Sequence, residues 1–194
     1  MTFIVAIQLN DSIIVASDKK KVTLREDRSI QLCDKKFSKL HAWDKGIITG
    51  TGESYVISRS VELFKKIAHS DINKLPQCLD LSRQIREQEI GTKYFQVENT
   101  KLLCSSYSQQ GAQLYKIERF NLLQPYTLTA IEPMDITVWL FHPNINAIST
   151  NLQDLYSDLK DYAMFTNQMD WMNYYINRIA PIYKKQSKED AFMS

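Results

Sequence analysis

The sequence has few cysteines and nearly equal numbers of positive and negative charges. Both facts exclude certain classes of protein. Its three cysteines, Cys33, Cys78 and Cys104, form no CxxC pair and have no histidine nearby, so we expect neither a disulfide framework nor a zinc site. The 24 lysines and arginines nearly balance the 22 aspartates and glutamates. No long block of one charge occurs, so a nucleic-acid-binding surface is not supported.

Long hydrophobic runs are also missing. No apolar stretch reaches the roughly 20 residues that a membrane-spanning helix needs. Residues 1–9 show neither the basic start nor the small-residue cleavage site of a secretory signal. We therefore expect a cytoplasmic protein with reduced thiols and no membrane contact. With 44% hydrophobic residues, a chain of 194 can bury one sizeable core, which predicts a single domain over residues 1–194.

The first 50 residues contain two predicted hairpins. Runs rich in isoleucine and valine at 3–9 and 13–17 are separated by turn-forming residues, and both faces of these strands are apolar. A polar stretch, 19–34, follows. The segments 36–43 and 47–49 then flank a second turn, which predicts another hairpin.

Helix and strand patterns alternate in blocks along the rest of the chain. Apolar residues recur at helical spacing from residue 53 to 68 and over 75–90, where Gly91 is placed to end the helix. Helical spacing returns from about 148 to 183, through Leu152, Leu155, Leu159 and Tyr162, with Pro181 near the end. Between these blocks lie four predicted strands, at 101–108, 112–120, 126–131 and 134–141. Strands and helices segregated in this way are typical of an α+β fold, with helices outside paired antiparallel sheets.

Thr2 is the residue that suggests chemistry. Threonine is small enough for the preceding methionine to be removed, and Thr2 would then begin the chain. A threonine hydroxyl is a poor nucleophile when neutral, but a free α-amino group with a pKa of about 7.7–8.0 can accept its proton at physiological pH. One residue would then supply both nucleophile and base. Because many sequences start with Met-Thr, this start alone is weak evidence for a nucleophile. The polar residues around Thr2 must support that interpretation.

Two charged residues are spaced to support Thr2. Asp18 ends the second strand of the hairpin that Thr2 begins, so an antiparallel fold-back returns it to the start of the chain. Lys36 opens the next predicted strand. A lysine beside the Thr2 amine would disfavour its protonation, and Asp18 would hold that lysine. Each residue alone has an ordinary alternative, since aspartates cap turns and lysines are mostly solvated.

The order of these segments resembles that of proteasome β-type subunits and their bacterial homologues. The resemblance rests on TFIVAIQLNDSIIVASD, then KKFSKL, then GIITGTGESY before an amphipathic helix. It covers residues 2–90, and more loosely extends to 131. It implies a four-layer αββα sandwich of two antiparallel sheets flanked by helices, the N-terminal nucleophile hydrolase type, although closing C-terminal strands are not evident.

The same resemblance implies a role for each residue of the motif. Thr2 would be the nucleophile, Asp18 the family's acidic residue, Lys36 its active-site lysine and Gly50 the source of the N–H that stabilises the oxyanion. An extended peptide would add as a strand at a substrate-binding edge. This edge comprises Lys20, Lys21, Val22 and Thr23, with Thr49 beside Gly50.

The resemblance also implies how the protein works with other molecules. It implies a homo-oligomeric ring or spiral acting on peptides or unfolded proteins, with no metal and no organic cofactor. The sequence leaves open whether an ATPase partner delivers the substrate.

The second half of the chain departs from the family pattern. The family places a Gly-Ser-Gly turn after the strand that corresponds to 126–131, whereas this chain reads Ile131-Glu132-Pro133 and has no glycine after Gly111. Asp190 and Ser194 are the nearest counterparts of a later Asp and Ser pair, with one residue too many between them. These departures favour an alternative, a non-catalytic proteasome-like protein that self-assembles. A third interpretation keeps the chemistry on a small amide substrate.

The remaining polar and aromatic candidates are interpreted as structural. The three histidines, His41, His69 and His142, have no partner at metal-ligand spacing, and each is expected to pack or lie on the surface. An aromatic stripe near the C-terminus is expected to belong to the core or to a subunit interface. It consists of Trp171, Tyr174, Tyr175 and Tyr183.

Overall fold

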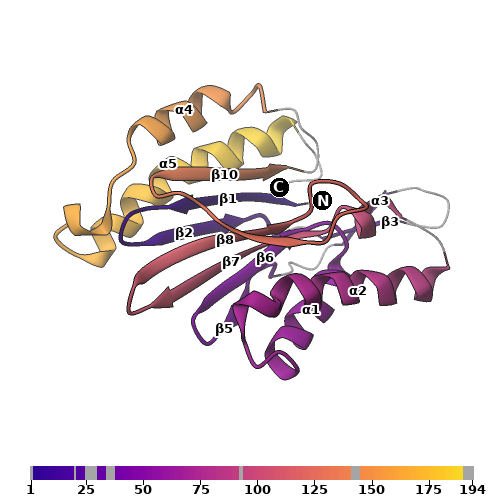
Figure 1. Cartoon of the computed structure of the whole chain (residues 1–194). Helices are drawn as coiled ribbons and strands as arrows, with labels where there is room; N and C mark the ends of the chain where they lie inside the picture. Colours follow the sequence, from indigo (N-terminus) through magenta and orange to yellow (C-terminus); the bar gives the residue numbers. More distant parts are fainter. Residues whose placement is uncertain are drawn as a thin grey trace. The chain divides into compact units, whose positions relative to one another are not determined.

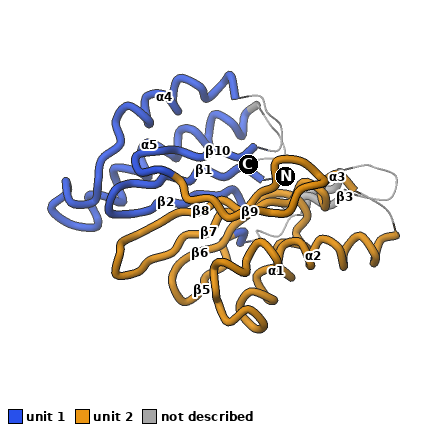
Figure 2. The backbone as a smooth tube through the Cα atoms, viewed as in Figure 1, with its two compact units in different colours: residues 1–39, 132–194 blue, residues 40–131 orange. Residues whose placement is uncertain are grey.

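The computed structural model describes residues 2–19, 21–24, 30–33, 38–91, 94–140 and 145–189, with the backbone alone for 21–24, 30–33 and 189. Contacts divide the chain into two compact units (Figure 2). Unit 1 combines residues 1–39 with 132–194, and unit 2 comprises residues 40–131. Both ends of the chain thus belong to unit 1. The single domain over 1–194 stays a prediction.

The main sheet of unit 1 is three-stranded and antiparallel, with two helices on one face (Figure 1). The strand order is β10-β1-β2, so the N-terminal strand is central. A short 3-10 turn, η2, connects the helices. The elements are β1 (Phe3–Gln8), β2 (Ile13–Ser17), β10 (Asp135–Leu140), α4 (Ser149–Ser157), η2 (Tyr162–Met164) and α5 (Gln168–Glu189).

β1 is buried along its whole length because it is apolar on both faces. Every second side chain, from Phe3 to Leu9, packs into one core cluster with α4 and α5, where it meets Leu155, Tyr175 and Ile182. The alternate residues, from Ile4 to Gln8, are buried as well. The hairpin of β1 and β2 therefore forms as its hydrophobic pattern predicts.

α5 joins the core of unit 1 through its aromatic side chains. Tyr175 is buried, and the other three members of the aromatic stripe pack against the same cluster. Pro181 does not end the helix, which continues to Glu189. Buried side chains on both sides of the proline, Ile179 and Gln186, hold this turn against the core and offset the lost backbone hydrogen bond.

The helical spacing expected through Leu159 and Tyr162 is not realised. α4 ends at Ser157, and the chain then turns. Arg178 of α5 binds the Asp158 carboxylate, with 2.6 Å between Nη2 and Oδ2. The Tyr175 hydroxyl accepts from the Lys160 N–H and donates to the Lys160 carbonyl. These contacts hold residues 158–160 against α5 and favour a turn over another helical turn.

A two-stranded sheet lies within the region predicted only as a polar stretch. β3 (Lys21–Leu24) and β4 (Ile30–Cys33) pair antiparallel, with Val22 opposite Leu32. The apolar residues at alternate positions explain these strands. The strand predicted over 36–43 is shorter than expected among the described residues, since β5 covers only His41–Trp43.

Unit 2 consists of a five-stranded antiparallel sheet with helices on one face (Figure 1). The order is β5-β6-β7-β8-β9, so strands that follow one another in sequence pair with one another. The further elements are β6 (Gly46–Thr51), α1 (Ser54–Lys66), η1 (Ile72–Lys74), α2 (Leu75–Ile90), α3 (Phe95–Glu98), β7 (Lys101–Ser108), β8 (Gly111–Glu118) and β9 (Thr127–Ala130).

Local signals set the ends of α1 and α2. The Glu53 carboxylate caps α1 by accepting the Val56 N–H at 2.9 Å. Pro76 lies in the first turn of α2, and Gly91 ends it with a left-handed φ of 64°. The helices bury Phe64 and Leu79 against the sheet.

The two units together give an α+β fold of antiparallel sheets flanked by helices, as the sequence predicts. None of the helices in the described residues combines the length and the hydrophobicity that crossing a lipid bilayer requires.

Burial of Cys104 in β7 makes folding sensitive to alkaline pH. Burial raises the pKa of its thiol from 9.0 to about 12. Between pH 9 and 12 the unfolded chain loses this proton while the folded chain keeps it, so this contribution to stability falls as pH rises. We expect urea unfolding to show a steeper alkaline loss of stability for the wild type than for Cys104→Ala. Parallel curves would contradict this assignment.

Candidate active site

The start of β1 is held by Asp18, at the end of β2. The Phe3 N–H donates to Asp18 Oδ1 with a nitrogen–oxygen distance of 2.7 Å, and the Asp18 N–H donates to the Phe3 carbonyl at 3.1 Å. The antiparallel register of the hairpin, in which Ile4 lies opposite Ser17, produces this pairing. Thr2, the residue before Phe3, is buried. The hairpin thus brings the Asp18 carboxylate to the peptide bond that follows Thr2.

A lysine pairs with the same carboxylate, and that lysine is Lys39. Its Nζ lies 2.7 Å from Asp18 Oδ2, and the two side chains are 11% and 3% exposed. Burial lowers the pKa of the Lys39 ammonium, and the negative charge of Asp18 opposes this shift. Lys36, the lysine expected from the family pattern, lies outside the described residues.

Tyr183 also contacts this site, and the sequence did not predict that contact. Its hydroxyl donates to the Phe3 carbonyl at 3.3 Å, and its ring lies 4.4 Å from the Phe3 ring, centroid to centroid. Burial raises the pKa of this phenol, so the group stays a donor. Both backbone polar groups of Phe3 are therefore bonded. The aromatic stripe of α5 predicted burial of Tyr183 but not this contact.

Gly50 and Thr49 lie in β6 of unit 2. A Cβ at Gly50 would lie 2.6 Å from the Lys101 carbonyl oxygen and 2.7 Å from a Leu102 methyl. Packing alone therefore requires glycine at this position, independently of any role of its N–H in binding an oxyanion. Thr49 is buried, and its Oγ1 has no hydrogen-bond partner in the part of the chain that the structure describes.

The predicted substrate edge falls partly within the described backbone. Lys20 lies outside the described residues. Lys21, Val22 and Thr23 belong to β3, which pairs with β4 on one side. The addition of a peptide strand at this edge stays a prediction.

The turn after β9 has an unusual backbone in place of the family's glycines. Met134, which follows Glu132 and Pro133, has a left-handed φ of 61°. A residue other than glycine in this conformation costs on the order of 1–3 kcal/mol. The side chain of Met134 packs against the core of unit 1, which holds it there. Farther along, α5 runs to Glu189, and Asp190 and Ser194 lie outside the described residues.

Other polar groups do not assemble into a metal centre within the described ranges, where no three side chains of histidine, cysteine, aspartate or glutamate are clustered. His41 is half-buried in β5, and both burial and the charge of Lys65 lower its pKa. His69 follows α1, and His142 lies outside the described residues.

Comparison with solved structures identifies the fold. Anbu from Hyphomicrobium sp. strain MC1, as a Gly-1 mutant, matches with a TM-score of 0.63 and 11% identity, over 100% of this chain and 78% of that one. Anbu from Yersinia bercovieri, described as an ancestral beta-subunit, matches with a TM-score of 0.62 and 11% identity, over 99% and 77%. Eukaryotic HslV from Trypanosoma brucei matches with a TM-score of 0.56 and 13% identity, over 99% and 94%.

The chain has the proteasome-like N-terminal nucleophile hydrolase fold. No protein-family model matches the sequence, and a comparison with curated proteins finds no relative. The similarity therefore establishes the fold alone.

We expect Asp18 and Lys39 to be strongly coupled in their effects on the free energy of unfolding. Asp18→Asn would remove the negative charge that lies beside the buried Lys39 ammonium, and we expect it to lower the free energy of unfolding by about 3–5 kcal/mol. Adding Lys39→Met should recover part of this loss. The measurement is a double-mutant cycle by urea unfolding near neutral pH, with the exposed pair Lys66 and Glu62 as the matched control, which should couple by less than about 1 kcal/mol. Equal coupling in the two cycles would contradict the prediction.

The loss of folding stability caused by Asp18→Asn should also depend on pH. Without the carboxylate, the pKa of Lys39 falls further below 10.5, because burial is no longer opposed. The unfolded chain then binds more protons than the folded chain in that range, so the stability of the variant rises with pH toward 10.5. Adding Lys39→Met should abolish this rise.

Proposed function

We propose that this protein is an N-terminal threonine hydrolase that cleaves peptide or unfolded-protein substrates after removal of Met1. The observation that carries the proposal is the buried Asp18–Lys39 pair, because Asp18 also binds the N–H of the residue after Thr2. The fold shared with HslV and Anbu supports it.

In the proposed reaction, Thr2 provides both the nucleophile and the base. Its α-amine accepts the hydroxyl proton while Oγ1 attacks the substrate carbonyl, and the Gly50 N–H receives the oxyanion. The amine then returns the proton to the leaving amine. Water hydrolyses the resulting ester by the same route and frees the threonine.

Lys39 is our candidate for the lysine that adjusts the Thr2 amine. A buried ammonium near that amine favours its neutral, basic form by like-charge repulsion. Asp18 keeps the lysine charged despite its burial. Lys36 stays a second candidate for this role.

Self-assembly into a homo-oligomeric ring or spiral is part of the proposal. A non-catalytic, self-assembling protein is the alternative, and the turn at Glu132, Pro133 and Met134 favours it. This turn replaces the serine that supports the terminal threonine in the family with residues that offer no hydroxyl.

Intact-mass spectrometry tests the proposed nucleophile. We expect the mature protein to lack Met1 and to gain one adduct with a β-lactone, because the ester forms on Thr2 Oγ1. Thr2→Ala should lose the adduct and Thr2→Ser should retain it. Retention of Met1 would rule out the proposal, since the base would then be an amide. Removal of Met1 without an adduct would support the non-catalytic alternative.

The rate of β-lactone adduct formation distinguishes the two lysines. If Lys39 adjusts the Thr2 amine, we expect Lys39→Met to slow the reaction by at least about tenfold and to raise the apparent pKa of its pH profile. Lys36→Met serves as the matched control and should react at nearly the wild-type rate. The reverse ranking would assign the role to Lys36.

A further inference from the structure

α5 has a row of apolar side chains that the core of unit 1 does not bury. Met169, Met172 and Ile176 are 63%, 40% and 54% exposed, and Ala180 is exposed as well. Their spacing of three, four and four positions places them on one side of the helix, over a length of about 16 Å. We call these four residues the α5 stripe. Exposed apolar groups gathered in this way mark interaction sites more often than isolated ones do.

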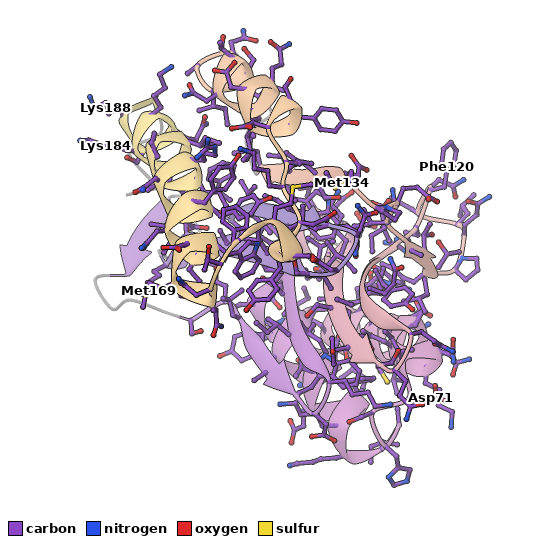
Figure 3. The ribbon with its side chains drawn as sticks, turned by 90° about the vertical axis from the view of Figure 1, so that its left-hand side faces the viewer. Asp71, Phe120, Met134, Met169, Lys184 and Lys188 are labelled. Atoms are coloured by element: carbon purple, nitrogen blue, oxygen red, sulfur yellow. The ribbon has the colours of Figure 1, made fainter. Side chains whose placement is uncertain are left out.

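One flank of the α5 stripe is polar, and its charges are separated along the helix. Asp170 lies at the N-terminal end of this flank, and Lys184 and Lys188 lie at its C-terminal end. Asn173 and Asn177 lie between them. Residues three, four or seven positions apart share one side of a helix, so all five belong to the same flank. Figure 3 shows both lysines on the side of α5 that faces away from the strands.

The charges of this flank are not neutralised within the part of the chain that the structure describes. The Asp170 carboxylate accepts the Asn167 side-chain amide at 2.8 Å. Among the described residues, neither Asp170 nor Lys184 nor Lys188 forms an ion pair. A partner that covers the α5 stripe would therefore meet one negative end and one positive end.

The other charged residues of α5 lie on the opposite side of the helix. Arg178 binds the Asp158 carboxylate there. Lys185 Nζ donates to Asn151 Oδ1 of α4 at 2.8 Å, and Glu189 falls on this side by its position in the helix. The charge pattern beside the α5 stripe is thus set by Asp170, Lys184 and Lys188.

This pattern is complementary to itself. Asp170 and Lys184 each lie seven positions from Asn177. If two copies of α5 cross antiparallel about a two-fold axis beside Asn177, Asp170 of each copy faces Lys184 of the other. The two Asn177 amides can then bond across the axis, and the helix dipoles oppose each other. A parallel pair would instead bring like charges together, so the pattern favours a second copy in the antiparallel direction.

We propose that the α5 stripes of two copies pack against each other, antiparallel, about a two-fold axis. The proposal specifies one contact of the self-assembly proposed above and rests on that part of the proposed function. Such a contact is isologous, so it joins subunits in pairs. A ring or spiral would need a second, different contact to grow from these pairs.

An exchange of charges tests the contact by sedimentation velocity. Asp170→Lys sets lysine against lysine at both ends of the contact, and Lys184→Glu sets acid against acid. We expect each variant alone to self-associate at least about tenfold more weakly than the wild type. An equimolar mixture should recover association, because one copy is then basic at both positions and the other is acidic at both. Circular dichroism verifies that each variant is folded.

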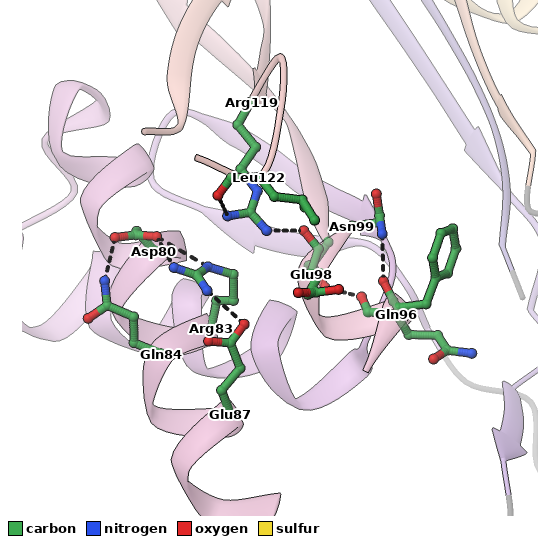
Figure 4. Close-up of polar contacts among 11 residues, drawn as sticks. Asp80, Arg83, Gln84, Glu87, Gln96, Glu98, Asn99, Arg119 and Leu122 are labelled. Atoms are coloured by element: carbon green, nitrogen blue, oxygen red, sulfur yellow. Dashed lines mark hydrogen bonds and ion pairs between the residues drawn. The ribbon is translucent and has the colours of Figure 1, made fainter. Parts of the chain in front are cut away.

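A substitution within the α5 stripe gives an independent test. Ile176→Arg places like charges near the axis, and we expect it to weaken self-association by more than about tenfold. The matched control, Phe120→Ser with Leu123→Ser, removes two exposed apolar side chains from the loop between β8 and β9. Arg119 holds that loop to the Glu98 carbonyl of α3 (Figure 4), so the control should stay folded and associate as the wild type does.

The outcomes separate this contact from the rest of the proposed function. If the mixture of the two charge variants associates no better than either variant alone, the contact is wrong and self-assembly still stands. Wild-type association by Ile176→Arg would have the same meaning. A wild type that stays monomeric would overturn both the contact and self-assembly, while the β-lactone test of Thr2 would be unaffected.

Discussion

The Asp18 carboxylate is the group on which the start of the chain depends. One oxygen accepts the Phe3 N–H and the other accepts the Lys39 ammonium, in surroundings from which water is largely excluded. In such surroundings each bond is stronger than in water, and removing one partner of a buried charged pair is costly. Asp18 therefore positions Thr2 through its contacts with Phe3 and Lys39, which lie 15 and 21 positions from it in the sequence.

The C-terminal helix completes this arrangement from the other end of the chain. Tyr183 bonds the Phe3 carbonyl across 180 residues, and the core of unit 1 combines β1 with α4 and α5. Contacts so distant in sequence form only after much chain entropy is lost. The geometry at Thr2 thus depends on residues that no inspection of the N-terminal motif would include.

The sequence predicted the parts of the fold that repeat a simple pattern. The apolar alternation of β1 and the helical spacing of α1 and α2 appear in the structure close to where they are expected. The pairing of β3 with β4 was missed because each strand has only two alternating apolar residues and four charged residues stand between the strands, which made 19–34 read as one polar stretch. The passage of α5 through Pro181 was missed because it depends on burial by residues distant in sequence.

The sequence pointed to one lysine of the site and not to the other. The family pattern selected Lys36, which lies outside the described residues, and gave no reason to consider Lys39, three positions farther along. A contact with Asp18 depends on the path of the backbone after β2. The structure gives Lys39 this contact, at 2.7 Å. Counting positions along the chain cannot supply that information.

A buried ion pair is a poor way to stabilise a fold. Apolar side chains of similar volume often serve as well or better, because they avoid the cost of removing two charges from water. The Asp18–Lys39 pair lies at the start of β1, where Asp18 also accepts the N–H of the residue after Thr2. Stability alone does not call for a buried lysine in that place. The proposed hydrolase gives it a role, because an ammonium kept charged by Asp18 would favour the neutral form of the Thr2 amine, and this argument favours the hydrolase over a purely structural role.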